Sequence, residues 1–180
     1  TVQLDGTNSS DPDGDPLIYS WTQTSGPSVT LTDANSAIAS FTAPPKTNAI
    51  QTLEFELVVA DPLDAADSRT VRIQVEANRA PIAQTSGNQF VAGGDTVTLD
   101  GSPSFDQDGD PLTYSWTQTS GPAVTLSGAN TANPTFTAPQ ATSSQQLLRF
   151  ALEVSDGLSN SGLTTTVVTV AANQQPLASA

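Results

Sequence analysis

The sequence contains two copies of one unit. A shift of 95 residues places Thr1 on Thr96 and makes the nine residues 19–27 identical to residues 114–122. The alignment continues without a gap to Asn78, which matches Asn173. Two copies in series predict two modules with the same fold, and they favour a function that depends on the array more than on one catalytic centre.

The phase of the repeat predicts where each module begins. Because Thr1 matches Thr96, the first copy has no counterpart of residues 78–95. Residues 173–178 match residues 78–83 and begin a further copy, so we expect this chain to be a window from a longer array. We therefore predict a first module over residues 1–77 that lacks its first strand, a second over 78–172, and the start of a third over 173–180.

Side-chain alternation predicts an all-β chain. In residues 53–59 the apolar side chains of Leu53, Phe55, Leu57 and Val59 share one face, and Glu54 and Glu56 point the other way; residues 148–154 keep the apolar positions. This period of two is typical of a strand with one wet face. Each copy contains six or seven such short segments between turn residues, which predicts two tandem immunoglobulin-like β-sandwiches joined end to end. In the first copy these include segments 2–4, 17–21, 29–31, 53–59 and 71–75 and the region around Phe41.

The charge balance limits the partners that we expect. Eighteen acidic residues against five basic ones give a formal charge of −13, and Cys, Met and His are absent. Nucleic acid is an unfavourable partner because its binding requires basic patches. A small domain without disulfides favours an extracellular, cell-surface or secreted protein of prokaryotic origin, stabilised by metal or by neighbouring repeats.

Catalytic constellations are absent from the sequence. Without His or Cys, activation of a nucleophile would depend on Lys46, the single lysine. The carboxylates cluster in turns, which suits a metal ion better than the two faces of a sugar ring. We therefore predict that this chain is not an enzyme.

Two conspicuous repeated features have structural explanations. Trp21 and Trp116 each share a strand face with a Tyr and a Leu, which favours a core position over an exposed platform for sugars. The segment Thr-Gln-Thr-Ser-Gly-Pro, at 22–27 and again at 117–122, fits a strand end that closes in a turn, although a binding loop is the alternative.

An aspartate-rich turn is the sharpest chemical feature of each copy. Its carboxylates alternate around a glycine and can converge on one hard cation, and calcium takes six to eight oxygen ligands. Flanking helices and the distant bidentate Glu of an EF-hand are missing. A turn without a metal is the alternative, because Asp-Gly and Asp-Pro are common turn formers. The candidate ligands are Asp11, Asp13 and Asp15 in the first copy and Asp106, Asp108 and Asp110 in the second.

Several motifs in the same order resemble a known family. The run Asp-x-Asp-Gly-Asp-Pro-Leu-x-Tyr-Ser-Trp is followed by Thr-Gln-Thr-Ser-Gly-Pro, then by Phe-Thr-Ala-Pro and a strand that ends in Asp. Together they resemble tandem polycystic kidney disease (PKD) domains, in the variant found in large bacterial surface proteins and in receptor-for-egg-jelly-like regions. The Trp-Asp-Phe-Gly-Asp-Gly segment of many PKD domains is replaced here by Trp21 and residues 22–27.

The resemblance adds candidate calcium ligands at two further places. It implies that the Asp at the end of the strand before the final hairpin joins the site, and that position is Asp61 or Asp156. It also implies an Asn at the entrance of the domain, which is Asn78 for the second module.

These observations predict a structural role outside the cell. We expect a spacer or fibre-forming repeat of an adhesin-like surface protein, stiffened by calcium and joined head to tail to neighbouring repeats or identical chains. Residues 173–180 are expected to add as a β-strand to the first module of a neighbouring chain. The alternative is a carbohydrate- or protein-binding accessory module of a secreted adhesin or of a polysaccharide-degrading enzyme. No transmembrane segment is expected in either case.

Overall fold

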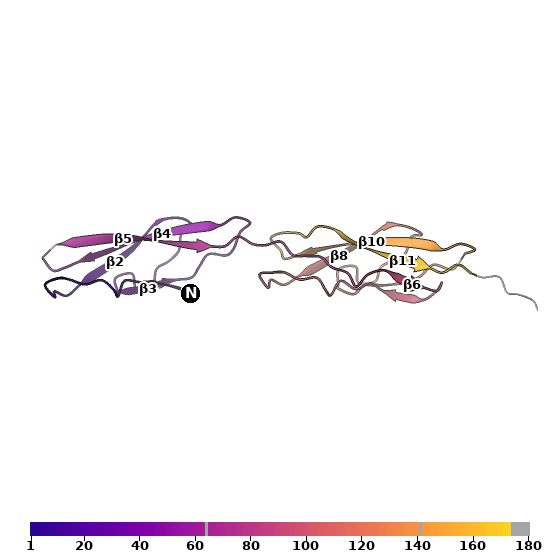
Figure 1. Cartoon of the computed structure of the whole chain (residues 1–180), viewed down its shortest axis with the longest axis horizontal. Coiled ribbons are helices and arrows are strands. Elements are labelled where there is room, and N and C mark those ends of the chain that lie inside the picture. Colours follow the sequence, from indigo (N-terminus) through magenta and orange to yellow (C-terminus); the bar gives the residue numbers. More distant parts are fainter. Residues whose placement is uncertain (64, 141, 174–180) are drawn as a thin grey trace, which may run out of the picture. The chain divides into compact units, whose positions relative to one another are not determined.

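The computed structural model describes residues 1–63, 65–140 and 142–173. Within these residues all regular structure is β-strand, and no helix offers a segment that could cross a bilayer. The chain divides into two compact units, Thr1–Asn78 and Arg79–Ala180. Figure 1 labels several strands of each unit. Asn78 falls with the first unit, where its backbone N–H donates to the Thr47 carbonyl at 2.7 Å. The expected third repeat lies, apart from Asn173, outside the described residues.

The first unit is built from two antiparallel sheets. β4 (Gln51–Ala60) lies between β2 (Ile18–Ser25) and β5 (Ala66–Val75) in the larger sheet. The smaller sheet pairs β1 (Val2–Asp5) with β3 (Ile38–Phe41). This is the all-β, immunoglobulin-like sandwich that the alternation predicts.

The second unit repeats this arrangement and adds one strand. Its larger sheet has the order β6-β11-β10-β8, formed by Gln89–Val91, Thr164–Val170, Gln146–Ser155 and Thr113–Ser120. Its smaller sheet pairs β7 (Thr96–Thr98) with β9 (Thr135–Thr137). The added strand β6 runs parallel to β11, with Val168 opposite Gln89 and Val170 opposite Val91. Among the described residues of the first unit, no strand pairs with β5 on its outer side.

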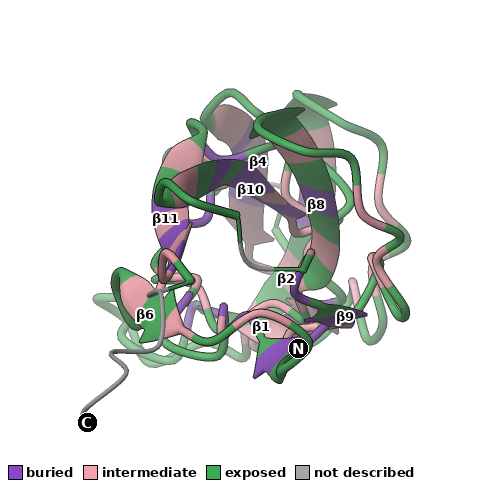
Figure 2. Cartoon of the chain, turned by 90° about the vertical axis from the view of Figure 1, so that its right-hand side faces the viewer, coloured by how far each residue is buried: buried purple, intermediate pink, exposed green. Residues whose placement is uncertain are grey.

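The core of each unit lies between its two sheets. In β4 the inward positions Leu53 and Phe55 are completely buried, while Glu54 and Glu56 are partly exposed. In β10 the inward positions 148, 150, 152 and 154 are buried in the same way, and Figure 2 shows buried residues along β10, β11 and β8. The two-residue period in the sequence is therefore the period of the core.

The segment around Val29 does not form the predicted strand. The side chain of Gln23 takes the hydrogen bonds that a strand partner would use: its amide donates to the carbonyls of Ser25 at 3.1 Å and Pro27 at 2.7 Å, and its oxygen accepts the Val29 N–H at 3.0 Å. Gly26 completes the turn at φ 94°, where a Cβ atom would meet the Thr52 carbonyl oxygen at 2.3 Å. Gln118 makes the same three contacts in the second unit. These contacts give the repeated Thr-Gln-Thr-Ser-Gly-Pro segment a structural role.

The two tryptophans occupy equivalent core positions. Trp21 and Trp116 are each 4% exposed, and both indole Nε1 atoms are buried without a hydrogen-bond partner in the described part of the chain. The six-membered ring of Trp116 lies against Gly101, where an added Cβ would come within 3.2 Å of its Cζ2 atom. Packing therefore holds the ring in place, and the glycine leaves room for it.

We predict that Trp116→Ala lowers the free energy of unfolding of the second module by about 3–5 kcal/mol. Trp116→Phe is the matched control. It should lower the free energy of unfolding by less, about 1–2 kcal/mol, because it keeps a buried aromatic ring and removes no hydrogen bond. Chemical denaturation of both variants measures the difference. Equal, small losses for the two variants would show that the ring is not a core residue.

Candidate functional site

The aspartate-rich turn of the second unit is organised by its first carboxylate. Asp106 Oδ1 accepts the backbone N–H of Asp108 at 2.7 Å and that of Asp110 at 3.4 Å, which closes the loop around Gly109. Gly109 has φ 80°, a conformation that favours glycine. As a result, Asp106, Asp108 and Asp110 each offer an oxygen atom within 4.8 Å of the other two.

One oxygen of this group lacks any hydrogen bond. Asp106 Oδ2 is buried and has no partner in the described part of the chain. Because a buried carboxylate oxygen is costly to leave unsatisfied, it marks a place that a cation would fill. Three carboxylates also match the hard oxygen ligands that calcium prefers. The residues present therefore fit the ion that the sequence suggests.

Arg79 already supplies positive charge to the turn. Its backbone N–H donates to Asp108 Oδ2 at 2.8 Å, and its guanidinium Nη1 lies 3.9 Å from Asp108 Oδ1. The Asp108 side chain is only 6% exposed, whereas that of Arg79 is 55% exposed. Arg79 was not among the residues that the sequence singled out, since nothing in a lone arginine at a module boundary indicates such a contact.

The strand-end aspartate follows β10 but does not join the converging group. Asp156 Oδ1 accepts the N–H groups of Leu158 at 2.7 Å and Ser159 at 2.6 Å, so it caps its own turn. Among the described residues, the converging group consists of Asp106, Asp108 and Asp110. Asn78 belongs to the first unit. The roles of Asp156 and Asn78 as ligands stay predictions.

The corresponding turn of the first unit has the same local hydrogen bonds but is more open. Asp11 Oδ1 accepts the N–H groups of Asp13 at 2.8 Å and Asp15 at 3.1 Å. Asp61 Oδ1 accepts those of Leu63 and Ala65. Asp13 and Asp15 are exposed, and no converging group forms here among the described residues.

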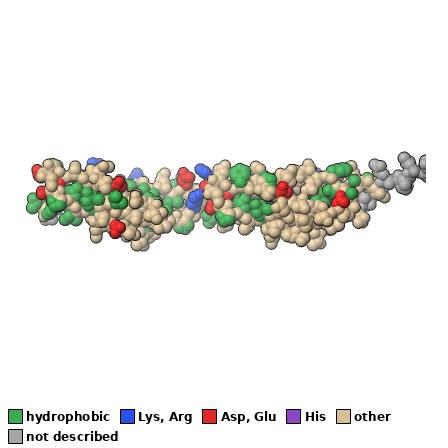
Figure 3. Space-filling view, turned by 90° about the horizontal axis from the view of Figure 1, so that it is seen from below, with side chains coloured by type: hydrophobic (Ala, Val, Ile, Leu, Met, Phe, Trp, Pro, Cys, Tyr) green, Lys and Arg blue, Asp and Glu red, His purple; other side chains and the backbone are tan. Residues whose placement is uncertain are grey.

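Other carboxylates of the chain serve local turns. The Thr7 hydroxyl and then the Thr7 backbone N–H hold the pKa of Asp5 below its usual range. In the second unit, the Ser102 hydroxyl and backbone N–H lower the pKa of Asp100 in the same way. Acidic side chains are scattered singly over the face shown in Figure 3, which is otherwise mostly uncharged. Solvated turns therefore account for much of the negative charge.

The family comparison agrees with the motifs and with the fold. The sequence matches the K319L-like PKD domain family twice, over residues 1–75 and 86–170. The chain belongs to this family. The PKD sandwich and its tandem repetition are thus established, and the first match begins at the first residue, directly before β1.

The chain is similar to parts of larger proteins and to a single PKD domain. Chitinase A of Pseudoalteromonas piscicida is 40% identical over 91 residues, which are 51% of this chain and 11% of that protein. The chain therefore spans about a tenth of the length of this curated relative. Among solved structures, the PKD domain from the KIAA 1837 protein is 22% identical, covering 58% of this chain and 100% of that one, with a TM-score of 0.42. An endo-fucoidan hydrolase of glycoside hydrolase family 107 is 23% identical, covering 89% of this chain and 24% of that one, with a TM-score of 0.35.

We predict that Arg79→Met lowers the melting temperature of the second module in low-salt buffer without calcium. The change removes the cation beside Asp108 and leaves three close carboxylates to repel one another, at a cost of about 0.2–1 kcal/mol because the guanidinium is largely exposed. Thermal unfolding at low and at high NaCl tests this, and salt should reduce the difference from the unaltered chain. Arg149→Met, which changes an exposed arginine of β10 in the same unit, is the matched control. A loss that is identical at both salt concentrations would contradict an electrostatic role.

Proposed function

We propose that the chain is a non-catalytic spacer of an extracellular or secreted protein, of prokaryotic origin, that separates functional domains or builds a surface fibre. The observation that carries this proposal is the tandem repetition of one PKD sandwich along nearly the whole chain. The largest aromatic side chains support it, since both tryptophans are buried in the cores and are not displayed for a ligand. A spacer needs stable folded units and a polar surface, and this chain supplies both.

In this proposal, calcium binds the aspartate-rich turn of the second module. Asp106, Asp108 and Asp110 supply carboxylate oxygens, and Asp106 Oδ2 gains the partner that it otherwise lacks. The ion would screen repulsion among the three carboxylates and stabilise the folded state by mass action. The turn of the first module, with Asp11, Asp13, Asp15 and Asp61, would bind more weakly because its acids are more exposed and, among the described residues, do not form a converging group.

We expect calcium to raise the melting temperature of the second module more than that of the first. Differential scanning calorimetry in millimolar calcium and in chelator measures both transitions. Asp106→Asn should remove most of the shift, because it removes a carboxylate from the group. Asp100→Asn is the matched control: it lies in the same module, outside the group, and should leave the calcium-dependent shift intact. Superimposable transitions of the unaltered chain with and without calcium would contradict the site.

We also propose that repeats of this kind join head to tail. Residues 173–178 match residues 78–83, with Pro176, Leu177 and Ala178 at the positions of Pro81, Ile82 and Ala83. Residues 173–178 therefore repeat the sequence pattern with which the second module begins. The strand that is added to a module would therefore come either from another repeat of a longer protein or from an identical chain.

A second candidate is an accessory module of a polysaccharide-degrading enzyme. The similarity to part of Chitinase A favours it, because the matched region is a small part of that protein. In this alternative, an exposed side chain such as Phe90, which is 67% exposed, would stack on a sugar ring.

Retention on insoluble polysaccharide distinguishes the two candidates. The spacer proposal predicts that the chain passes through chitin and cellulose, and that it migrates unchanged in gels containing fucoidan. Retention of the unaltered chain that Phe90→Ala abolishes would favour the accessory module, with Phe105→Ala as the matched control for another exposed phenylalanine. No retention would leave the spacer as the better explanation.

A further inference from the structure

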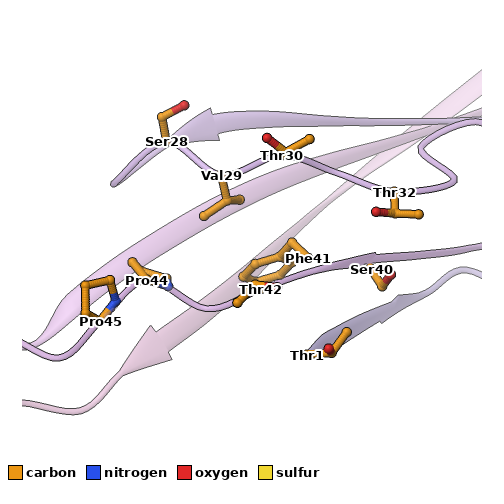
Figure 4. A pocket seen from close by; sticks show the side chains of 10 residues that line it. All are labelled: Thr1, Ser28, Val29, Thr30, Thr32, Ser40, Phe41, Thr42, Pro44 and Pro45. Carbon is orange, nitrogen blue, oxygen red and sulfur yellow. The ribbon is translucent and has the colours of Figure 1, made fainter.

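The strands of both units turn their apolar side chains mainly toward the core. Figure 4 shows this in the first unit, where Val29 points toward Phe41. The outward face of the larger sheet in the second unit departs from this pattern. There Leu147 is 50% exposed and Val167 is partly exposed. Core packing therefore does not account for the residues on this face.

The outward positions of β8, β10 and β11 include two charged side chains. Along β10 the outward residues are Leu147, Arg149, Ala151 and Glu153, which alternate with buried positions. The outward residues of the neighbouring strands are uncharged: Thr113, Ser115, Thr117 and Thr119 in β8, and Thr165, Val167 and Thr169 in β11. In a chain with a formal charge of −13, a face with one base and one acid lets two copies approach without repulsion.

Ala151 lies at the centre of this face. The strand register places it between Thr117 of β8 and Thr165 of β11. Ala151 is 4% exposed, although it is not part of the core cluster between the sheets. Because its side chain is a single methyl group, it does not project toward a facing surface, and a second sheet can pack over it.

The two charges lie at equal distances on either side of Ala151. Arg149 is two residues before it and Glu153 is two residues after it, so each lies about 7 Å away along the strand. Arg149 is exposed and makes no ion pair with the described residues. Glu153 is partly buried, and its Oε1 accepts a side-chain N–H of Asn160 at 3.4 Å. A base and an acid placed symmetrically about a small residue form a self-complementary pattern.

The first unit has the same three strands but a different pattern of charge. At the position of Ala151 it has Glu56. At the position of Arg149 it has Glu54, whose Oε1 already pairs with the Nε atom of Arg72 at 2.6 Å. Two copies facing each other here would bring Glu56 close to Glu56. The shared fold therefore does not by itself produce the balanced face of the second unit.

We propose that the outward face of the larger sheet in the second unit binds the same face of a second copy of the chain. The copies are related by a two-fold axis that lies between the facing sheets and crosses β10 at Ala151. This symmetry places Arg149 of each copy opposite Glu153 of the other, so that both charges are paired. An axis parallel to the strands would instead place Arg149 opposite Arg149, and repulsion disfavours it.

Charge complementarity favours a second copy over other partners. An acidic partner would leave Glu153 without a counter-charge, and a basic partner would do the same to Arg149. A copy in two-fold symmetry satisfies both residues. This side-by-side contact goes beyond the proposed spacer function, and it involves neither the proposed calcium ligands nor residues 173–180.

The contact between free chains is weak. A face of three strands with exposed ion pairs buries less than the about 800 Å² per partner of a standard interface. We expect a dissociation constant of about 0.1–1 mM. Chains anchored side by side would associate more strongly, because anchoring raises their effective concentration. In the proposed surface fibre, the contact would hold neighbouring chains together laterally.

Charge-swap variants test this contact. Arg149→Glu and Glu153→Arg should each weaken self-association at least about tenfold, because like charges then face each other twice in every dimer. An equimolar mixture of the two variants should associate as the unaltered chain does, because one supplies the bases and the other the acids. The double variant keeps the net charge and should associate within about twofold of the unaltered chain. Sedimentation velocity in physiological salt, at chain concentrations up to about 1 mM, measures each case.

Arg72→Glu is the matched control, since it makes the same change of charge on the outward face of the first unit. It should leave self-association unchanged, and circular dichroism verifies that each variant is folded. An unaltered chain that stays monomeric at the highest concentration would overturn the proposal. So would equal association of Arg149→Glu and the unaltered chain, or a mixture that fails to associate.

A single thiol on the two-fold axis gives a second measurement without a change of charge. The sequence contains no cysteine, so Thr117→Cys adds one thiol to the chain. Because position 117 lies in the same row as Ala151, it faces its own copy, and a short bismaleimide should join two chains. Thr22→Cys, at the equivalent position of the first unit, is the matched control and should give at least about fivefold less dimer. Equal yields for the two variants would contradict the contact.

Discussion

The contact between two phenylalanine rings is the interaction on which each sandwich depends. Phe41 of β3 and Phe55 of β4 come from opposite sheets, and their ring centroids lie 4.8 Å apart at an interplanar angle of 36°. Phe136 and Phe150 repeat this contact at 4.9 Å and 39°. Because a two-sheet fold without helices buries apolar surface only where its sheets face each other, these rings fix the sheet spacing around which every other core residue packs.

Packing the centre of the sandwich and covering its side are two separate requirements of the fold. The first module forms the aromatic contact and buries Trp21 without any counterpart of residues 79–95, so the central packing does not depend on that segment. What changes is the inner side of the last strand, which is closed in β11 and partly open in β5.

Residues 79–95 also connect the fold of the second module to the candidate metal centre. Arg79 contacts Asp108 through both its backbone and its side chain, while the rest of the same segment completes the sandwich. In the second module, the aspartate turn has partly buried carboxylates that converge, and in the first module the equivalent acids are more exposed. Residues 79–95 therefore both add a strand to the larger sheet and contact one of the proposed calcium ligands.

The sequence by itself determined the all-β class, the tandem organisation and the core positions, because a two-residue period and an internal repeat can both be recognised in the order of the residues alone. It also located the aspartate turns, whose hydrogen bonds join residues two to four positions apart. Only the tertiary structure decided that Arg79 contacts Asp108, since these two residues are 29 positions apart. It likewise replaced the predicted strand at 29–31 with contacts from Gln23, because a side chain that competes for backbone hydrogen bonds leaves no periodic signal.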